Sequence, residues 1–167
     1  MSEMIDELRA ALGRERVMES KLELHLYGRD AGVYRGNPSV VAIPETTEEV
    51  VEIVKIAGRH EAPVVARGAG TGLAAGAVPT EGGVVLVTTR MNQIHEIDPV
   101  KRTAWVGPGV INLDLSTAAA PYGLYFAPDP SSQAACTVGG NIANNSGGPH
   151  CLAEGSTVNH VLALEVV

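Results

Sequence analysis

The sequence has few cysteines, an excess of acidic over basic residues and no long apolar run. Its two cysteines, Cys136 and Cys151, have neither C-x-x-C spacing nor a metal-ligand pattern, so free thiols in a reducing compartment are expected. The net charge of −7 argues against nucleic acid or an anionic membrane as a partner. No apolar run approaches the ~18 residues of a membrane helix, and the acidic start M-S-E-M-I-D-E-L does not resemble a signal peptide. These absences predict a cytoplasmic protein.

The composition is typical of a folded domain with an unusual amount of glycine. Apolar residues make up 45% of the 167 residues, which argues against disorder and is enough for one domain with its own core. The chain contains 19 glycines, and many of them fall in two segments. Glycine lets the backbone adopt positive φ and removes the Cβ that keeps a ligand away from the amides. The two segments are therefore the first places to look for a bound ligand.

The first glycine-rich segment follows the β-branched pair Val64-Val65 and contains Gly68, Gly70 and Gly72. Backbone amides turned inward in such a loop form an anion nest that suits phosphate or pyrophosphate. The spacing G-x-G-x-G differs from the dinucleotide fingerprint G-x-G-x-x-G, and Pro79 leaves little room for the long helix that should follow it. No G-K-[ST] ending is present, so a P-loop is excluded. A purely structural turn is the alternative on spacing alone.

The second segment runs from Pro128 to His150, P-D-P-S-S-Q-A-A-C-T-V-G-G-N-I-A-N-N-S-G-G-P-H. Small hydroxyl and amide side chains alternate here with apolar ones, which favours a snug site that reads hydrogen bonds. The alternative is a crowded turn in which Asn adopts the left-handed conformation and Ser caps a helix.

Together with the stretch H-C-L-A-E-G-S-T-V-N-H-V-L-A-L-E-V-V, these segments resemble the FAD-binding domain of the vanillyl-alcohol oxidase/p-cresol methylhydroxylase (PCMH) superfamily. Within it, the sequence is most similar to the flavoprotein subunit of glycolate oxidase and to FAD-linked D-lactate and D-2-hydroxyglutarate dehydrogenases. Three motifs occur in order between about Pro38 and Val167. The resemblance implies a helical lead-in over residues 1–37 and a PCMH-type FAD-binding domain over residues 38–167.

The pattern of the first half predicts a parallel β-α-β unit. Met4, Ile5, Leu8 and Leu12 have helical spacing closed by Gly13, whereas the stretch 21–30 is expected to be irregular. Strands are expected at 40–43, 64–66 and 84–87, with a helix over 50–57 capped at Thr46 or Thr47. The first glycine loop then leaves the carboxyl end of a parallel strand, where ligands usually bind.

The second half predicts mainly antiparallel structure. Apolar and polar side chains alternate in residues 94–98 and 103–106, and a turn separates the two stretches, so they indicate a hairpin. A helix is expected over residues 111–120, capped by Asn112 or nearby. A final strand is expected over residues 162–167. The expected fold is therefore α+β: two subdomains of the PCMH type, a parallel β-α-β part followed by a mainly antiparallel part. A final strand without a following turn indicates an unfinished sheet, so the fold is expected to be C-terminally incomplete. The resemblance implies that a separate substrate or cap domain follows in the relatives, and this domain is expected to be absent here.

The resemblance implies that FAD lies between the two subdomains and is held non-covalently, because residues 68–79 contain no His or Cys for a covalent link. Cys136 lies near a position where a few relatives use a cysteinyl link, but a plain buried cysteine is favoured. The implied cofactor-binding residues are Arg67, Gly68, Ala69, Gly70, Thr71 and Gly72 around the pyrophosphate, Pro128, Ser131, Thr137, Gly140, Asn141 and Asn144 toward the flavin, and Gly147 and Gly155 at close backbone approaches.

The resemblance also implies oxidation of a 2-hydroxy acid, glycolate or D-lactate, by hydride transfer to the flavin. An iron–sulfur or other electron-acceptor subunit is the implied partner, and a homodimer is one option for assembly. His150 is the one candidate near the flavin, with a turn-capping role as the alternative, and no catalytic base or metal ligand is assigned. Two other functions stay open: a non-catalytic flavin-binding or assembly fragment that needs a partner chain, and a nicotinamide-dependent dehydrogenase.

Overall fold

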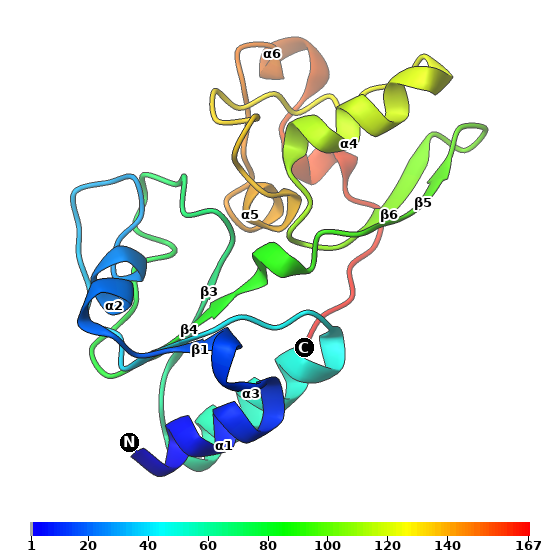
Figure 1. The fold of residues 1–167 in the computed structure, drawn as a ribbon. Coiled ribbons are helices and arrows are strands. Elements are labelled where there is room, and N and C mark those ends of the chain that lie inside the picture. Colours follow the sequence, from blue (N-terminus) through cyan, green and yellow to red (C-terminus); the bar gives the residue numbers. More distant parts are fainter. Residues whose placement is uncertain (1) are drawn as a thin grey trace. The chain divides into compact units, whose positions relative to one another are not determined.

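The computed structural model of the chain describes residues 2–167, which fall into two compact units (Figure 1). One unit comprises the residues up to Arg90 together with Val167, and the other runs from Met91 to Val166. The elements of the first unit, in chain order, are α1 (Ser2–Leu12), the 3-10 turn η1 (Arg14–Arg16), β1 (Val17–Met18), α2 (Lys21–Tyr27), β2 (Val40–Ala42), α3 (Thr47–Arg59), β3 (Val64–Arg67), β4 (Val84–Val87) and η2 (Thr88–Arg90).

The first unit is built on a four-stranded sheet with the order β1-β2-β4-β3. Strands β2 and β3 both pair with β4 in parallel, and β1 adds an antiparallel edge next to β2. The expected β-α-β unit is therefore present, but β4 lies between its two strands. The central strands β2 and β4 are entirely buried, which explains why they read as continuous runs of Val, Ala and Leu.

Helices cover both faces of this sheet. On one face, α1 and α3 pack against alternate strand residues in a core made of Met4, Ile5, Leu8, Leu12, Val17, Val40, Ala42, Ile53, Ile56, Ala57, Val84 and Leu86. On the other face, Leu24 and Tyr27 of α2 pack against Val41, Val85 and Val87. The period of two along each strand thus divides the apolar residues between two cores.

Local signals fix the ends of the helices. Gly13 follows α1 with φ of 91°, a conformation that glycine adopts without a steric penalty. Thr46 caps α3, its hydroxyl accepting a hydrogen bond from the amide of Glu49 at 3.2 Å, so the capping signal in the sequence is confirmed. The carboxylate of Glu49 in turn accepts two hydrogen bonds from the Arg16 guanidinium, at 2.6 and 2.7 Å, and so links α3 to η1.

The expectation of an irregular stretch over residues 21–30 is wrong for its first part, where α2 forms. The signal is a capping box: the Ser20 hydroxyl accepts from the amide of Glu23, while the Glu23 carboxylate accepts from the amide of Ser20. Two reciprocal bonds at the amino end stabilise a helix of only seven residues, of which Leu24 and Tyr27 pack against the second face of the sheet.

The second unit contains β5 (Ile94–Asp98), β6 (Thr103–Val106), α4 (Asn112–Ala119), η3 (Ala120–Tyr122), α5 (Val138–Ala143), α6 (Cys151–Glu154) and η4 (Thr157–His160). The antiparallel hairpin β5–β6 is confirmed, and Asp98 closes its turn by accepting hydrogen bonds from the amides of Val100 and Lys101. A small core of Val110, Leu115 and Val138 holds the hairpin and the helices together.

Two expectations for this unit are wrong. Residue Asn112 does not cap α4: the cap position is Ile111, without a side-chain bond, and Asn112 is the first helical residue, with its amide group buried. Residues 162–167 form no strand, since no other strand among residues 2–167 pairs with them, and their side chains are exposed. The α+β class itself, with a parallel part followed by an antiparallel part, is confirmed.

The packing of α1 makes a direct prediction about stability. Leu8 is completely buried between α1, α3 and the sheet. The substitution Leu8→Ala leaves a cavity, so we expect it to lower the free energy of unfolding by about 2–5 kcal/mol in urea denaturation. Leu22→Ala is the matched control, because Leu22 on α2 is 68% exposed, and it should change stability by less than ~0.5 kcal/mol. Equal effects of the two substitutions would contradict the described packing of α1.

Candidate cofactor site

The first glycine loop begins at Gly68, directly after β3, at the carboxyl edge of the parallel strands. Within residues 2–167, the backbone amides of Ala69, Gly70, Thr71 and Gly72 donate no hydrogen bond to any part of the chain. Unpaired amides in a loop are favourable partners for an anion, because each can donate one hydrogen bond. These four amides are therefore available to donate hydrogen bonds to a bound anion.

The glycines of this loop serve different purposes. A Cβ at Gly72 would meet nothing within 4 Å, so this position leaves open space for a ligand. Gly70 has φ of 71°, and a Cβ there would lie 2.0 Å from the guanidinium of Arg67. The absence of a side chain at Gly70 thus makes room for a residue of the same chain, which the sequence argument about ligand approach did not foresee.

The Arg67 side chain contacts other residues of its own unit. Its Nη1 donates to the carbonyl oxygen of Arg29 at 2.6 Å, and its guanidinium carbon lies 5.4 Å from the centre of the Tyr27 ring. Burial lowers the pKa of the Arg67 guanidinium, while the nearby Tyr27 and Asp30 act in the opposite direction. The guanidinium is therefore held between the glycine loop and residues 27–30, which is called the inner side of the loop below.

The segment 29–32 lies beside this loop. The amide of Ala31 donates to the carbonyl oxygen of Gly72 at 3.1 Å, so the segment supports the loop from its own backbone. Asp30 is 7% exposed, and its Oδ1 accepts from the amide of Gly32 at 2.8 Å. Its Oδ2 is buried and has no hydrogen-bond partner among the described residues.

The second glycine-rich segment is organised by Asn112, which is completely buried. Its side-chain Nδ2 donates to the carbonyl oxygen of Pro128 at 2.9 Å and to Oδ1 of Asn141 at 3.0 Å. Its backbone amide donates to the carbonyl oxygen of Cys136 at 3.0 Å. One residue of α4 thus brings together Pro128 and Asn141, two residues of the predicted site.

Several predicted side chains are already engaged within the unit. Thr137 caps α5, its hydroxyl accepting from the amide of Gly140 at 3.4 Å. Asn141 is 2% exposed, and its Nδ2 donates to the sulfur of Cys136 at 3.2 Å. Cys136 is therefore a buried cysteine, as favoured from the sequence, whereas Ser131 and Asn144 are exposed.

The turn interpretation of this segment also describes part of its geometry. Asn145 has φ of 47°, in the left-handed region, and a threonine in place of a serine caps the helix. A Cβ at Gly155 would lie 2.5 Å from the side chain of Asn159, and a Cβ at Gly147 would be in tight contact, at 3.2 Å, with the side chain of Cys151. These glycines therefore have local packing reasons in addition to the cofactor role expected for them.

His150 forms an ion pair with Asp129 across the segment. The Nδ1 of His150 lies 2.5 Å from Oδ2 of Asp129, and this hydrogen bond raises the pKa of the imidazole and lowers the pKa of the carboxyl group. Gly148 lies so close to Asp129 that a Cβ would fall 2.1 Å from its oxygens. The imidazole is largely exposed and precedes α6.

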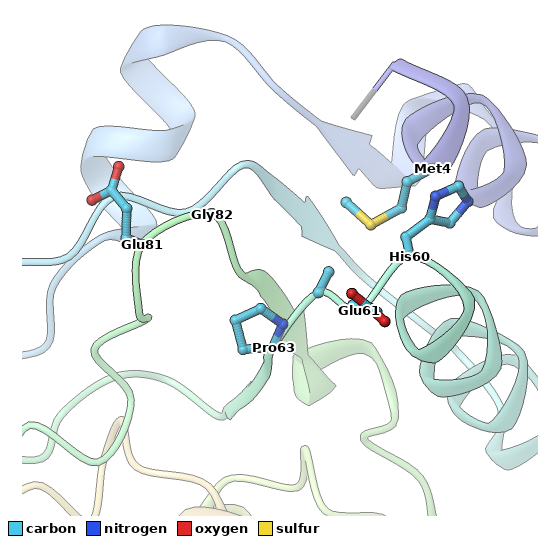
Figure 2. A pocket seen from close by; sticks show the side chains of 7 residues that line it. Met4, His60, Glu61, Pro63, Glu81 and Gly82 are labelled. Carbon is cyan, nitrogen blue, oxygen red and sulfur yellow. The ribbon is translucent and has the colours of Figure 1, made fainter.

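A hollow of about 240 Å³ lies elsewhere on the first unit (Figure 2). It is lined by Met4, His60, Glu61, Ala62, Pro63, Glu81 and Gly82. Pro63 and Gly82 precede β3 and β4, so the hollow is at the amino ends of the parallel strands. It contains none of the predicted site residues, and His60 is already paired with Glu7 at 2.7 Å.

The described residues contain neither a cluster of metal-binding side chains nor a helix that could span a membrane. No group of three or more His, Cys, Asp or Glu side chains within residues 2–167 could hold a metal ion. None of the helices in that range is long and apolar enough to cross a membrane.

Sequence reasoning missed three residues that shape the site: Tyr27, Asp30 and Asn112. Tyr27 was hidden by the irregular structure expected over 21–30, although the Ser20–Glu23 capping box marks the helix that carries it. Asn112 was predicted to be a helix cap, because a polar residue at the start of a helix usually has that role. No local pattern marks Asp30 as buried.

Comparison with known proteins places the chain among flavoproteins. Residues 38–167 match the family described as FAD binding domain. The chain is 53% identical to glycolate oxidase subunit GlcD of Escherichia coli (strain K12) over 133 residues, which cover 80% of the chain and 27% of that protein. It is 46% identical to glycolate oxidase subunit GlcD of Bacillus subtilis over 156 residues, 93% of the chain and 33% of that protein. It is 48% identical to D-lactate dehydrogenase of Archaeoglobus fulgidus over 128 residues, 77% and 28% of the two chains.

Solved structures agree on the fold. Alkyldihydroxyacetonephosphate synthase superposes with a TM-score of 0.83 at 22% identity, covering 93% of this chain and 31% of that one. For p-cresol methylhydroxylase the TM-score is 0.77 at 25% identity, over 87% and 29% of the two chains. The chain thus spans about a third or less of these relatives. It belongs to the FAD binding domain family and has the fold of the vanillyl-alcohol oxidase/p-cresol methylhydroxylase superfamily.

Proposed function

We infer that this chain is the FAD-binding part of an FAD-linked oxidoreductase that oxidises a 2-hydroxy acid of the glycolate or D-lactate type. The observation that carries the proposal is the loop 69–72, whose backbone amides have no acceptor among residues 2–167. Such amides favour an anionic group, and the family of the chain supplies the identity of that group, the pyrophosphate of FAD.

The loop and its flanking residue form the proposed pyrophosphate site. Gly72 leaves space for close approach, and the charge of Arg67 lies behind Gly70. The residues on this side are Arg67, Gly68, Ala69, Gly70, Thr71 and Gly72.

The second glycine-rich segment supplies the proposed flavin side. Its residues are Pro128, Ser131, Thr137, Gly140, Asn141, Asn144, Gly147 and Gly155. Asn112 donates hydrogen bonds to the backbone carbonyl of Pro128 at 2.9 Å and to the side-chain oxygen of Asn141 at 3.0 Å, so the Pro128 backbone and the Asn141 side chain are held in place. Thr137 and Asn141 are nearly buried, so we propose that they shape the turn. The exposed Ser131 and Asn144 are proposed to contact the cofactor, although the Asn144 side-chain amide also donates to the carbonyl oxygen of Gly140 at 3.1 Å.

The attachment of FAD is proposed to be non-covalent. Residues 68–79 contain no nucleophilic His or Cys. The buried sulfur of Cys136 faces the side-chain amide of Asn141, from which it accepts a hydrogen bond at 3.2 Å. A cysteinyl link would require this contact to break.

FAD, when bound, supplies the acceptor for the hydride that leaves the carbinol carbon of the substrate. The chain's own residues bind and orient the cofactor, and no side chain here is assigned as the base that takes the hydroxyl proton. The named relatives include a glycolate oxidase subunit and a D-lactate dehydrogenase. From these names we propose a 2-hydroxy acid as substrate and a further electron-accepting subunit, an iron–sulfur protein being one such acceptor.

The visible spectrum of the chain tests this function directly. After incubation with FAD and removal of free nucleotide, we expect a yellow protein with flavin absorbance bands, although binding by this portion of the fold should be weak. Denaturation should release all the chromophore, which chromatography should identify as FAD and not FMN. Flavin that stays with the denatured polypeptide would contradict non-covalent binding. Absence of flavin together with a spectral response to NADH would favour the nicotinamide-dependent alternative.

Activity requires a separate test, because the chain matches only about a third of its relatives. We expect the FAD-loaded chain alone to leave the flavin oxidised when glycolate or D-lactate is added. The remaining part of a relative, supplied as a second polypeptide, should restore bleaching of the flavin absorbance by the hydroxy acid. Bleaching by the chain alone would show that it is a complete catalyst. If the mixture bleaches with neither acid, the non-catalytic binding or assembly role is the better reading.

The pair Asp129–His150 gives the flavin side a dependence on pH. The pKa of His150 is raised by its bond to Asp129, so the contribution of the pair to stability is fully present below the ordinary imidazole value of 6.5 and is lost as pH rises through the raised value. The pKa of Asp129 is lowered, so the contribution is present above its ordinary value of 3.8 and is lost as pH falls through the lowered one. The pair is therefore most stabilising between about pH 4 and 6.5.

NMR titration of the His150 ring protons checks this dependence. The measured pKa should lie above 6.5 in the unmodified chain and should fall toward 6.5 in Asp129→Asn, because the amide removes the negative charge. An unchanged His150 pKa in the variant would contradict the ion pair.

A further inference from the structure

We propose that Arg67 is a positioning residue of the pyrophosphate loop, which acts from behind Gly70 and is not itself a phosphate ligand. This proposal rests on the proposed FAD-binding function, since it states how one side of that site is built. Its basis is the direction in which the Arg67 side chain turns at the end of β3.

The guanidinium of Arg67 occupies the space where residue 70 would carry a side chain. A Cβ at position 70 would lie 2.0 Å from Nη2 and 2.3 Å from the guanidinium carbon. Gly70 also has φ of 71°, which L side chains rarely adopt. Glycine at this position is therefore favoured by its φ, and a side chain there would in addition have to displace the Arg67 guanidinium.

Three neighbours hold the guanidinium in that place. The carbonyl oxygen of Arg29 accepts a hydrogen bond from Nη1 at 2.6 Å, and the ring of Tyr27 lies 5.4 Å from the guanidinium carbon. The buried carboxylate of Asp30 contributes an attractive charge interaction. All three belong to the segment that follows or ends α2, far from β3 in the sequence.

Asp30 adds a weaker, longer-range interaction to the same cluster. Its carboxylate is 7% exposed, and its Oδ2 has no hydrogen-bond partner among the described residues. Asp30 and Arg67 are not in ion-pair contact, but the negative charge of Asp30 raises the pKa of the guanidinium against the larger lowering by burial. The bond to Arg29 and the Tyr27 ring are therefore the main contacts that hold Arg67.

The conformation of the loop 68–72 is therefore restrained by the residues packed behind it, Arg67 and Ala31. Its amides at 69–72 make no bond within the described chain that could fix their direction. The guanidinium against Gly70 and the bond from the Ala31 amide to the Gly72 carbonyl supply the missing restraints. A preorganised nest binds an anion more tightly than a mobile one, because less conformational entropy is lost on binding.

A double-mutant cycle between positions 67 and 70 tests this arrangement. The variants are Arg67→Ala, Gly70→Ala and the combination, with FAD affinity measured by equilibrium dialysis. We expect Arg67→Ala alone to weaken FAD binding by about tenfold. Gly70→Ala should weaken binding more in the presence of Arg67 than in the Arg67→Ala background, because the steric conflict exists only when the guanidinium is present.

Gly72→Ala is the matched control for the cycle. Position 72 is in the same loop, but a Cβ there meets nothing within 4 Å of the chain. Its effect on FAD affinity should therefore be the same factor with Arg67 or Ala at position 67. If the effects of Arg67→Ala and Gly70→Ala instead multiply as independent factors, Arg67 does not act through Gly70 and the proposal is overturned.

The affinities of Arg67→Ala for FAD, ADP and riboflavin distinguish a role in positioning the phosphate loop from a general loss of structure. Arg67→Ala should reduce the affinity for ADP by the same factor as for FAD and leave the affinity for riboflavin, which lacks phosphate, unchanged. Equal losses for all three would indicate a merely structural role and overturn the proposal. Arg67→Lys, which keeps the charge but loses the planar fork, should recover part of the FAD affinity and provides a folded variant if the alanine protein unfolds.

Failure of the proposed function has a different signature. If the unmodified chain binds neither FAD nor ADP, the pyrophosphate site does not exist and both proposals fall. If it binds both and positions 67 and 70 show no coupling, FAD binding stands and only the role of Arg67 is refuted.

Discussion

A loop that offers its backbone amides to a ligand cannot use those amides to hold itself in place. Residues 69–72 face this constraint, since their amides donate no hydrogen bond within residues 2–167. The restraint comes instead from side chains and backbone of the segment after α2, through Arg29, Asp30 and Ala31. This segment follows α2, which packs against one face of the sheet of the first unit.

The second unit meets a similar constraint with a different device. Asn112 does not cap α4. It donates two side-chain hydrogen bonds and one backbone hydrogen bond to the second glycine-rich segment. Its Oδ1 is left buried without a partner among the described residues, an arrangement that is unfavourable in isolation. The three bonds offset that penalty and hold Pro128 and Asn141 near one another, which the sequence separation of these residues would not do.

Regular elements of the fold were predictable because their signals are local. The continuous apolar run of β4 predicted a buried strand, and Thr46 with Glu49 predicted where α3 begins. The FAD binding family followed from two glycine-rich segments whose order and composition are specific. The helix α2 was not predicted, although its Ser20–Glu23 capping box is a local signal for a helix start. The strand expected at 162–167 is wrong because an alternating pattern of apolar residues does not supply a strand to pair with.

The inner side of the site was not predictable because it depends on tertiary contacts. The burial of Asp30 and the direction of Arg67 depend on contacts between residues 38 positions apart, such as the Arg67–Arg29 bond, and no spacing rule reports them. This has a practical consequence for protein engineering. The string R-G-A-G-T-G transplanted into another scaffold carries the glycines but not Tyr27, Arg29 and Asp30, and Arg67 would then have no anchor. The transferable module is the pair of segments 27–32 and 67–72, moved together.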